Sequence, residues 1–227
     1  MNYLAHGYRF LNDPLFVAGT AVPDWLSVAD RKVRARRRLV QPVVEKTTSP
    51  HVKTIGRGIL QHHADDDVFH RCELFQQLSS ELATEFRGGM PDEFDHRPGF
   101  LGHIVVELML DAALAEDDPG LLDQYYATLG EVDSSVIEDV VNGMATRQTQ
   151  RLAWFIDRFR EERFLYDYRD DATLLVRLNQ VLRRVKLPVL PASGMETLAF
   201  ARRLLRRHAS DLLATVELQN SLQENDL

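Results

Sequence analysis

The chain has 227 residues, of which 44% are hydrophobic and 27% charged, and its formal net charge at pH 7 is −7. This negative balance gives no general reason to expect nucleic acid as a partner, because nucleic-acid binding usually requires a basic domain or stripe. The single cysteine, Cys72, excludes an internal disulfide framework and fits a reducing compartment, so we expect a cytoplasmic protein.

Neither a membrane span nor a secretory signal is expected. No run approaches the roughly 18 apolar residues that a membrane-spanning helix needs. The first ten residues, MNYLAHGYRF, lack the basic region followed by an apolar stretch that marks a secretory signal.

Apolar residues at three- and four-residue spacing dominate the chain and predict helices, whereas strand-like alternation is scarce. The stretch 39–50 contains Pro42 and Pro50 and is predicted to be the longest irregular connection. We therefore predict an all-α fold, a single-domain helical bundle over residues 1–218, with 219–227 as a frayed tail. Short breaks are expected at 88–91, 117–120 and 186–191. The predicted helices lie near residues 3–12, 14–22, 51–87, 99–116, 119–128, 133–147, 150–164, 170–184 and 194–218.

Charge is unevenly distributed, because the run RKVRARRR, from Arg31 to Arg38, is strongly basic within an acidic chain. A run of this kind is typical of a solvated helix face. It would also serve as a docking surface for an acidic partner.

The segment GILQHHADDDVFH, residues 58–70, places polar groups within an apolar stripe. At about 100° per residue, His62 and Asp66 fall in the same narrow band as Ile55, Ile59 and Phe69. His70 lies between this band and the opposite face. The other polar residues of the segment are predicted to face solvent: His63, Asp65 and Asp67.

The segment FLGHIVVELMLDAAL, residues 100–114, is apolar almost all round and predicts a buried helix. It carries His103 and Glu107 four residues apart. A buried imidazole and a buried carboxylate need partners, since an unpaired buried charge costs several kcal/mol or becomes neutral.

Two helices thus each present a histidine and a carboxylate at i and i+4, a spacing that lets both side chains reach one ion. Imidazole and carboxylate together are typical ligands of zinc, iron and manganese, and the scarcity of cysteine argues against a thiolate-rich structural zinc site. Asp24, which follows Pro23, and His6 are further candidate ligands. The alternative is that these pairs are only hydrogen-bonded side chains.

Other chemistries find little support. Cys72 lies in an apolar helical stretch and is predicted to be a core residue rather than a nucleophile. No glycine-rich phosphate loop, G-x-S-x-G elbow or dinucleotide-binding fingerprint is present.

Four separated motifs resemble the acyl carrier protein phosphodiesterases, helical metal-dependent hydrolases related to the HD-domain phosphohydrolases. MNYLAH is similar to the start of that family, and AGTAVPDWL to its small-residue segment that ends in an aspartate. GILQHHADD resembles its G-I-x-x-H-x-x-x-D signature, and VVNGMATRQ its N-G-M-A-S/T-R stretch. The motifs occur in the same order over about residues 1–150.

The resemblance implies an HD-domain-like fold and a metal site formed by Asp24, His62 and Asp66, with His6 close to it. Asp66, Asp24 and Arg147 are the predicted catalytic residues; the planar cation of Arg147 would either meet a phosphate or pair with an acid. Asn142 and Gly143 are assigned a structural role.

Where the family carries two aspartates in its next helix, this chain has His103 and Glu107. This substitution makes the ligand set richer in nitrogen and leaves the divalent ion open among Mn, Fe, Mg and Zn. The implied reaction is release of 4′-phosphopantetheine from holo acyl carrier protein, a step of lipid metabolism. The basic run would dock that acidic protein.

Two other hypotheses stay open. The sequence GTAVPD and the later histidine–glutamate pair also resemble bacterial zinc-dependent phospholipase C-type proteins, which are all-helical phosphoesterases. The third hypothesis is a non-catalytic helical binding protein that retains a relic metal site.

Overall fold

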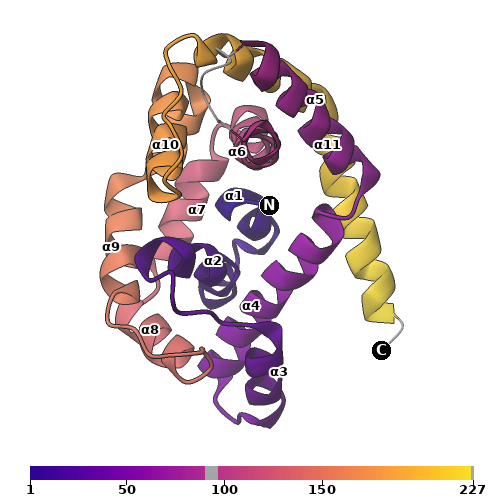
Figure 1. Cartoon of the computed structure of the whole chain (residues 1–227). Helices are drawn as coiled ribbons and strands as arrows, with labels where there is room; N and C mark the ends of the chain where they lie inside the picture. Colours follow the sequence, from indigo (N-terminus) through magenta and orange to yellow (C-terminus); the bar gives the residue numbers. More distant parts are fainter. Residues whose placement is uncertain (90–96, 226–227) are drawn as a thin grey trace. The chain divides into compact units, whose positions relative to one another are not determined.

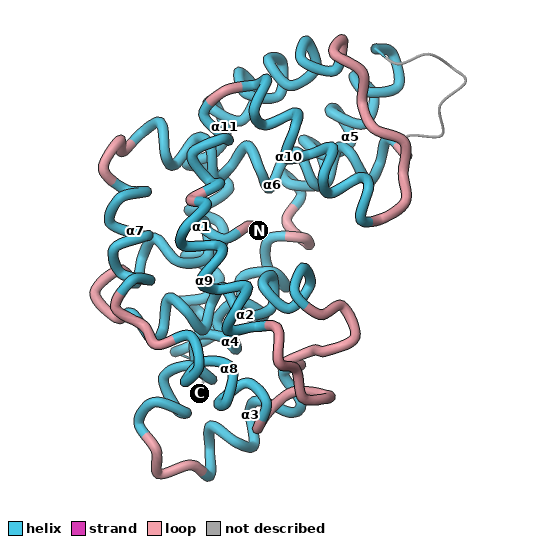
Figure 2. Tube along the Cα trace, turned by 90° about the vertical axis from the view of Figure 1, so that its left-hand side faces the viewer, coloured by secondary structure: helices cyan, strands magenta, loops and turns pink. Residues whose placement is uncertain are grey.

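The computed structural model describes residues 1–89 and 97–225 (Figure 1). Eleven α-helices and two short 3₁₀ helices account for the regular structure of these residues. Figure 2 shows helices and loops and no strand over the same ranges. The prediction of an all-α fold is confirmed.

Contacts within the chain separate into two compact units. The first unit comprises residues 1–67 and 120–163, and the second comprises residues 68–119 and 164–227. The prediction of one domain over residues 1–218 is not tested by this division and stays a prediction.

The first unit is built around α2, which contacts α1, α7 and α9. Its apolar core includes Trp25 of α2, whose ring meets that of Phe159 of α9 edge-on at 5.6 Å between centroids. Tyr3 of α1 packs on the same phenylalanine ring at 4.9 Å. The helices of this unit are α1 (Tyr3–Gly7), η1 (Tyr8–Phe10), α2 (Pro14–Ala29), α3 (Arg37–Lys46), most of α4 (Pro50–Phe69), α7 (Leu121–Gly130), α8 (Ser134–Asn142) and α9 (Leu152–Glu162).

Two glycines let α2 and α4 cross with their backbones in contact. A Cβ atom on Gly58 would lie 2.3 Å from the carbonyl oxygen of Phe16, and one on Gly19 would lie 2.4 Å from that of Ile55. Both distances are far shorter than any allowed contact, so no side chain fits at either position. The crossing brings the carbonyl of Thr20 to the ring of His62, which lies one turn after Gly58 on α4.

The second unit is organised around α6, on which α5 and α11 pack. Gly102 allows the close approach of α5, because a Cβ atom there would lie 2.2 Å from the Ser79 carbonyl oxygen. The helices of this unit are α5 (Glu73–Gly89), α6 (Pro98–Asp117), η2 (Phe164–Arg169), α10 (Asp171–Arg184) and α11 (Gly194–Asn225).

Among the described residues, α6 is the one helix long and apolar enough to cross a membrane by length and composition, with a mean hydropathy of 1.4. However, 61% of this apolar stretch is buried inside the structure. A core helix of a protein that never meets a membrane has the same properties, so α6 is only a weak indication of a membrane span.

The predicted helix over residues 51–87 is wrong at its middle, because α4 ends at Phe69 and α5 begins at Glu73. The amides of Arg71 and Cys72 both donate to the Val68 carbonyl and turn the chain. The buried thiol of Cys72 then accepts a hydrogen bond from the Phe75 amide at 3.4 Å and caps α5. Cys72 is therefore a structural residue of this turn.

Several other boundaries differ from the predicted ones. The helix predicted over 14–22 continues through Pro23 and ends at Ala29, as α2. The stretch 39–50 is not irregular, since α3 runs from Arg37 to Lys46 and includes Pro42. Pro42 cannot donate the usual hydrogen bond within the helix, but the burial of Val40 and Val44 stabilises α3. The predicted helix over 133–147 ends at Asn142.

The expected breaks and the expected tail are only partly covered by the described residues. Residues 88 and 89 still belong to α5, whereas Met90 and Pro91 lie outside the described residues. The last helix, α11, extends through Asn225, beyond its predicted end at 218. Residues 226–227 lie outside the described part of the chain.

We predict that Gly58→Ala lowers the free energy of unfolding by about 1–3 kcal/mol, because its methyl group must push α2 away from α4. Gly130→Ala, also in the first unit, is the matched control, since nothing lies within 4 Å of the added carbon. Urea unfolding followed by circular dichroism measures both. Equal stabilities of the two variants would show that the helices do not cross as closely as described.

A partly exposed cluster of ion pairs in the second unit predicts a pH dependence. Hydrogen bonds from Arg206 and Arg202 hold the pKa of Glu116 below its ordinary value, although burial works to raise it. A carboxyl whose pKa is lowered by folding stabilises the protein above its unfolded-state pKa of about 4.3, and this stabilisation is lost as the pH falls.

Glu116→Gln should therefore lower the free energy of unfolding at pH 7 by at most about 1 kcal/mol, because solvent screens these partly exposed ion pairs, and the difference from wild type should shrink below about pH 4. Denaturant unfolding at a series of pH values measures this. A difference that stays constant with pH would contradict it.

Candidate metal centre

Three side chains of the first unit converge on one point. His62 and Asp66 lie one turn apart on α4, and His6 comes from α1. The Nε2 atom of His6 lies 3.3 Å from Asp66 Oδ1, and that of His62 lies 3.4 Å from Asp66 Oδ2. The three ligand atoms lie within 4.8 Å of one another, and both histidines are buried. We call these three residues the first triad.

The hydrogen bonds of the two rings fix which nitrogen carries the proton. His62 Nδ1 lies 2.9 Å from the carbonyl oxygen of Thr20, which can only accept. His6 Nδ1 lies 3.3 Å from an oxygen of the Asp65 carboxylate, which also accepts. Both rings therefore carry a proton on Nδ1, and in their neutral form both Nε2 atoms present a lone pair toward Asp66.

Lone pairs that face a carboxylate need a positive charge between them. His6 Nε2 is buried and has no hydrogen-bond partner among the described residues. Protonating both rings at Nε2 would place two imidazolium ions face to face, since the ring centroids of His6 and His62 are 4.0 Å apart. A single divalent cation would satisfy both nitrogens and the carboxylate at once.

The Asp66 carboxylate already attracts positive charge in this structure. The α-amino group of Met1 donates a hydrogen bond to its Oδ1 at 2.7 Å. Burial works to raise the pKa of Asp66, but the charge of the Met1 amino group holds it well below its ordinary value. Asp66 is therefore ionised and available as an anionic ligand.

Asp65 was predicted to face solvent, and this prediction is wrong. Its side chain is fully buried and contacts His6, accepts two hydrogen bonds from Arg9 and accepts a third from Gln61 at 2.8 Å. Burial works to raise its pKa, and the hydrogen bond from His6 and the charge of Arg9 lower it overall. Asp65 thus orients His6 in the way that carboxylates orient metal-binding histidines.

His63 was also predicted to face solvent but is half-buried. Its Nε2 lies 2.7 Å from the Ala35 carbonyl oxygen. Burial lowers its pKa more than this hydrogen bond raises it, so the ring is neutral and donates to the carbonyl. Asp67 is exposed, as predicted, and pairs with Arg37 at 3.2 Å.

The second unit contains a second group of possible ligands, which we call the second triad: His70, His103 and Glu107. The Nε2 atoms of both histidines approach the same oxygen of Glu107, at 2.8 Å for His70 and 3.2 Å for His103. Burial works to raise the pKa of Glu107, but the hydrogen bonds from both rings lower it. The short contact from His70 is an ordinary hydrogen bond, and both rings are partly exposed.

The sequence pattern identified His103 and Glu107 but left His70 undecided. His70 follows the end of α4, where the helical angle no longer applies, so periodicity could not place it. No spacing in the sequence links His70 to His103 and Glu107, which lie on α6.

Two other predicted site residues lie outside these triads. Asp24 is half-buried on α2, one turn beyond Thr20, and its carboxylate is not among the ligand atoms that converge. Its assignment as a ligand stays a prediction. Arg147 is exposed in the turn after α8, where it lines a separate cavity with other cations.

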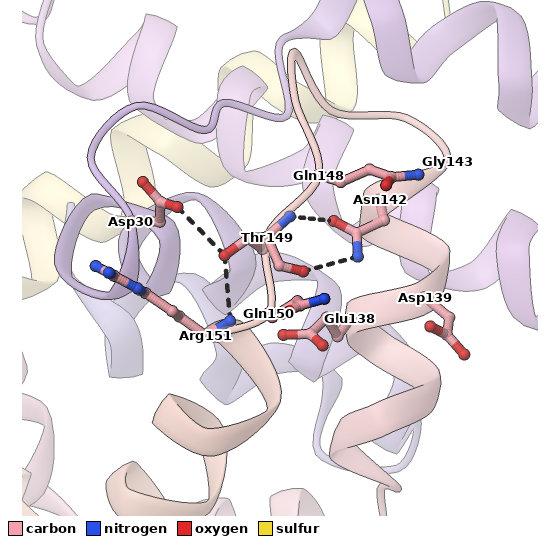
Figure 3. A pocket seen from close by; sticks show the side chains of 9 residues that line it. All are labelled: Asp30, Glu138, Asp139, Asn142, Gly143, Gln148, Thr149, Gln150 and Arg151. Carbon is pink, nitrogen blue, oxygen red and sulfur yellow. Dashed lines mark hydrogen bonds between the residues drawn. The ribbon is translucent and has the colours of Figure 1, made fainter.

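Asn142 has the structural position predicted for it. Its side-chain amide donates to the Thr149 carbonyl and accepts from the Thr149 amide, at 2.9 and 2.7 Å (Figure 3). The Thr149 hydroxyl also donates to Asp30 at 3.4 Å, and both residues line a cavity of about 780 Å³. These bonds shape the turn that carries Arg147.

Comparison of the chain with models of protein families, with curated proteins and with solved structures finds no match. The resemblance to the acyl carrier protein phosphodiesterases therefore depends on the four motifs alone.

We predict that Asp65→Asn weakens the binding of Zn²⁺ or Mn²⁺ by about 10- to 100-fold, although it removes no ligand, because His6 loses its orienting carboxylate. Asp67→Asn is the matched control on the next residue, where the carboxylate is exposed. Isothermal titration calorimetry of the chelator-treated proteins measures the affinities. Equal affinities for Asp65→Asn and wild type would show that Asp65 does not orient His6 for a metal ion.

Proposed function

We propose that the protein is a divalent-metal-dependent phosphodiester hydrolase that acts on holo acyl carrier protein or a related phosphoester. The observation that carries the proposal is the first triad, in which two buried imidazoles with fixed protons present their lone pairs to one carboxylate. The four family-like motifs agree with it, since His6, His62 and Asp66 all lie within them.

The composition of the first triad favours a catalytic over a structural ion. Catalytic sites commonly use three protein ligands and leave a position open, whereas structural zinc sites are closed by four. Two imidazoles and one carboxylate suit zinc, iron or manganese better than magnesium, which prefers oxygen ligands. A divalent ion held there would lower the pKa of a bound water and polarise a phosphoryl oxygen.

Other residues of the first unit orient the ligands of the first triad and balance their charge. His6 and His62 present Nε2 atoms whose direction is set by Asp65 and by the Thr20 carbonyl. Arg9 neutralises Asp65, so that this carboxylate orients His6 without adding net charge to the site. Asp24, one turn beyond Thr20 on α2, is assigned to the same site as a further carboxylate.

The proposed substrate protein is acidic, and the basic run supplies the opposite charge. Arg37 and Arg38 are exposed at the start of α3, where they can meet a protein partner. Complementary charge of this kind accelerates association more than it tightens binding. The absence of disulfide-forming cysteine pairs agrees with a cytoplasmic encounter.

The second triad supports a second candidate function. Two triads that each contain two histidines and one carboxylate are the nitrogen-rich ligand sets expected of a zinc enzyme. A zinc-dependent phosphoesterase of the phospholipase C type is therefore the alternative. Stoichiometric zinc without hydrolysis of holo acyl carrier protein would favour it.

We predict that Asp66→Ala reduces metal-dependent hydrolysis of bis(p-nitrophenyl) phosphate to the level of the chelator-treated protein, because the only carboxylate of the first triad is lost. Asp67→Ala is the matched control, since its exposed carboxylate points away from the triad. Activity is measured with added Mn²⁺, Zn²⁺ or Fe²⁺, and circular dichroism checks that both variants remain helical.

Retained activity in a folded Asp66→Ala variant would refute the assignment. Release of 4′-phosphopantetheine from holo acyl carrier protein, followed by mass spectrometry, tests the natural substrate separately. A wild-type protein that folds without metal and hydrolyses no phosphodiester with any of these ions would instead support a non-catalytic binding protein.

A further inference from the structure

A second cavity of the first unit is lined almost entirely by cations. It has a volume of about 470 Å³ and lies between the loop before α3 and the turn after α8. This volume falls within the range of small-molecule binding sites. We call it the basic cavity, and its lining residues are Lys32, Arg34, Arg36, Thr146 and Arg147.

The two walls of the basic cavity are held together by two hydrogen bonds between Arg34 and Thr146. The Arg34 amide donates to the Thr146 hydroxyl at 3.0 Å, and the Thr146 amide donates to the Arg34 carbonyl at 2.9 Å. The bonds of Thr149 to Asp30 and Asn142 fix the same two segments next to this pair (Figure 3). The cations are therefore positioned by structure that does not depend on their own side chains.

The charges of the basic cavity are not balanced by acids. No carboxylate from the described part of the chain lines it, although the whole chain has a net charge of −7. Among the described residues, Lys32, Arg36 and Arg147 form no ion pair, and the Arg34 guanidinium donates only to the neighbouring Val33 carbonyl. Four cations gathered in one cavity repel one another, and a bound anion would remove this cost.

We propose that the basic cavity binds a small molecule that carries a diphosphate group. The planar guanidinium groups of the three lining arginines can each donate two parallel hydrogen bonds to the oxygens of a phosphate group. A single phosphate monoester carries about −1.5 to −2 charges at pH 7, which neutralises only about half of four cations. Two linked phosphates balance the charge and fit the volume.

This site is distinct from the first triad, which contributes none of its lining residues. The two are nevertheless connected, because His63 holds the Ala35 carbonyl, in the loop between two of the lining arginines. His63 directly follows the triad residue His62 on α4. The diphosphate site extends the proposed function, and its test does not depend on the metal.

The test is isothermal titration calorimetry of the full chain, treated with chelator, with pyrophosphate and with ADP at low salt. We expect both to bind, and Arg36→Gln and Arg147→Gln each to weaken binding about tenfold, because each removes charge-assisted hydrogen bonds. Arg38→Gln is the matched control, because this exposed arginine of the same run does not line the cavity. His62→Ala should leave binding unchanged.

The outcomes separate this site from its alternatives. Tighter binding of ADP than of pyrophosphate identifies a nucleotide as the source of the diphosphate, and equal binding identifies the free diphosphate. Equal weakening by Arg38→Gln would show a diffuse basic surface and overturn the proposal. Failure to bind either ligand, with binding of apo acyl carrier protein lost in Arg147→Gln, would overturn it in favour of protein docking.

Discussion

The first triad depends on one hydrogen bond, from His62 Nδ1 to the carbonyl oxygen of Thr20. It can form only because Gly19 and Gly58 let the backbones of α2 and α4 touch. The bond fixes the tautomer of His62 and turns its Nε2 toward Asp66. Backbone contact, rather than side-chain packing, therefore sets the geometry of the candidate metal centre, and such contact leaves little freedom for the ring to move.

The surroundings of the first triad explain why so much charge is tolerated in the first unit. Asp65 is buried but is matched by Arg9, and Asp66 is matched by the Met1 amino group. A buried carboxylate without such partners would become protonated and lose its value as a ligand. The unit thus keeps two adjacent carboxylates ionised, one available as a ligand and one as a support for His6.

The sequence predicted the features that depend on local periodicity. The all-α fold, the inward direction of His62 and Asp66, and the buried helix with Glu107 all follow from apolar spacing. Asp65 was missed because its burial depends on Arg9, 56 residues away, which a helical angle cannot reveal. The break after Phe69 was missed because a cysteine thiol, an unusual cap, ends the pattern. The basic cavity forms where the loop at Arg34 meets the turn at Thr146, so the basic run from Arg31 to Arg38 could not reveal it by itself.

Neighbouring residues of α4 make three different sets of contacts. His62 and Asp66 belong to the first triad, Asp65 contacts Arg9, and His63 contacts the loop at Ala35. Each residue advances the helix by about 100°, so these roles depend on an unbroken register from Gly58 onward. One inserted or deleted residue between Gly58 and His62 would turn every one of these side chains to the wrong partner, while leaving composition and helix propensity almost unchanged. The number of residues between Gly58 and His62 is therefore as important for these contacts as the identity of the residues themselves.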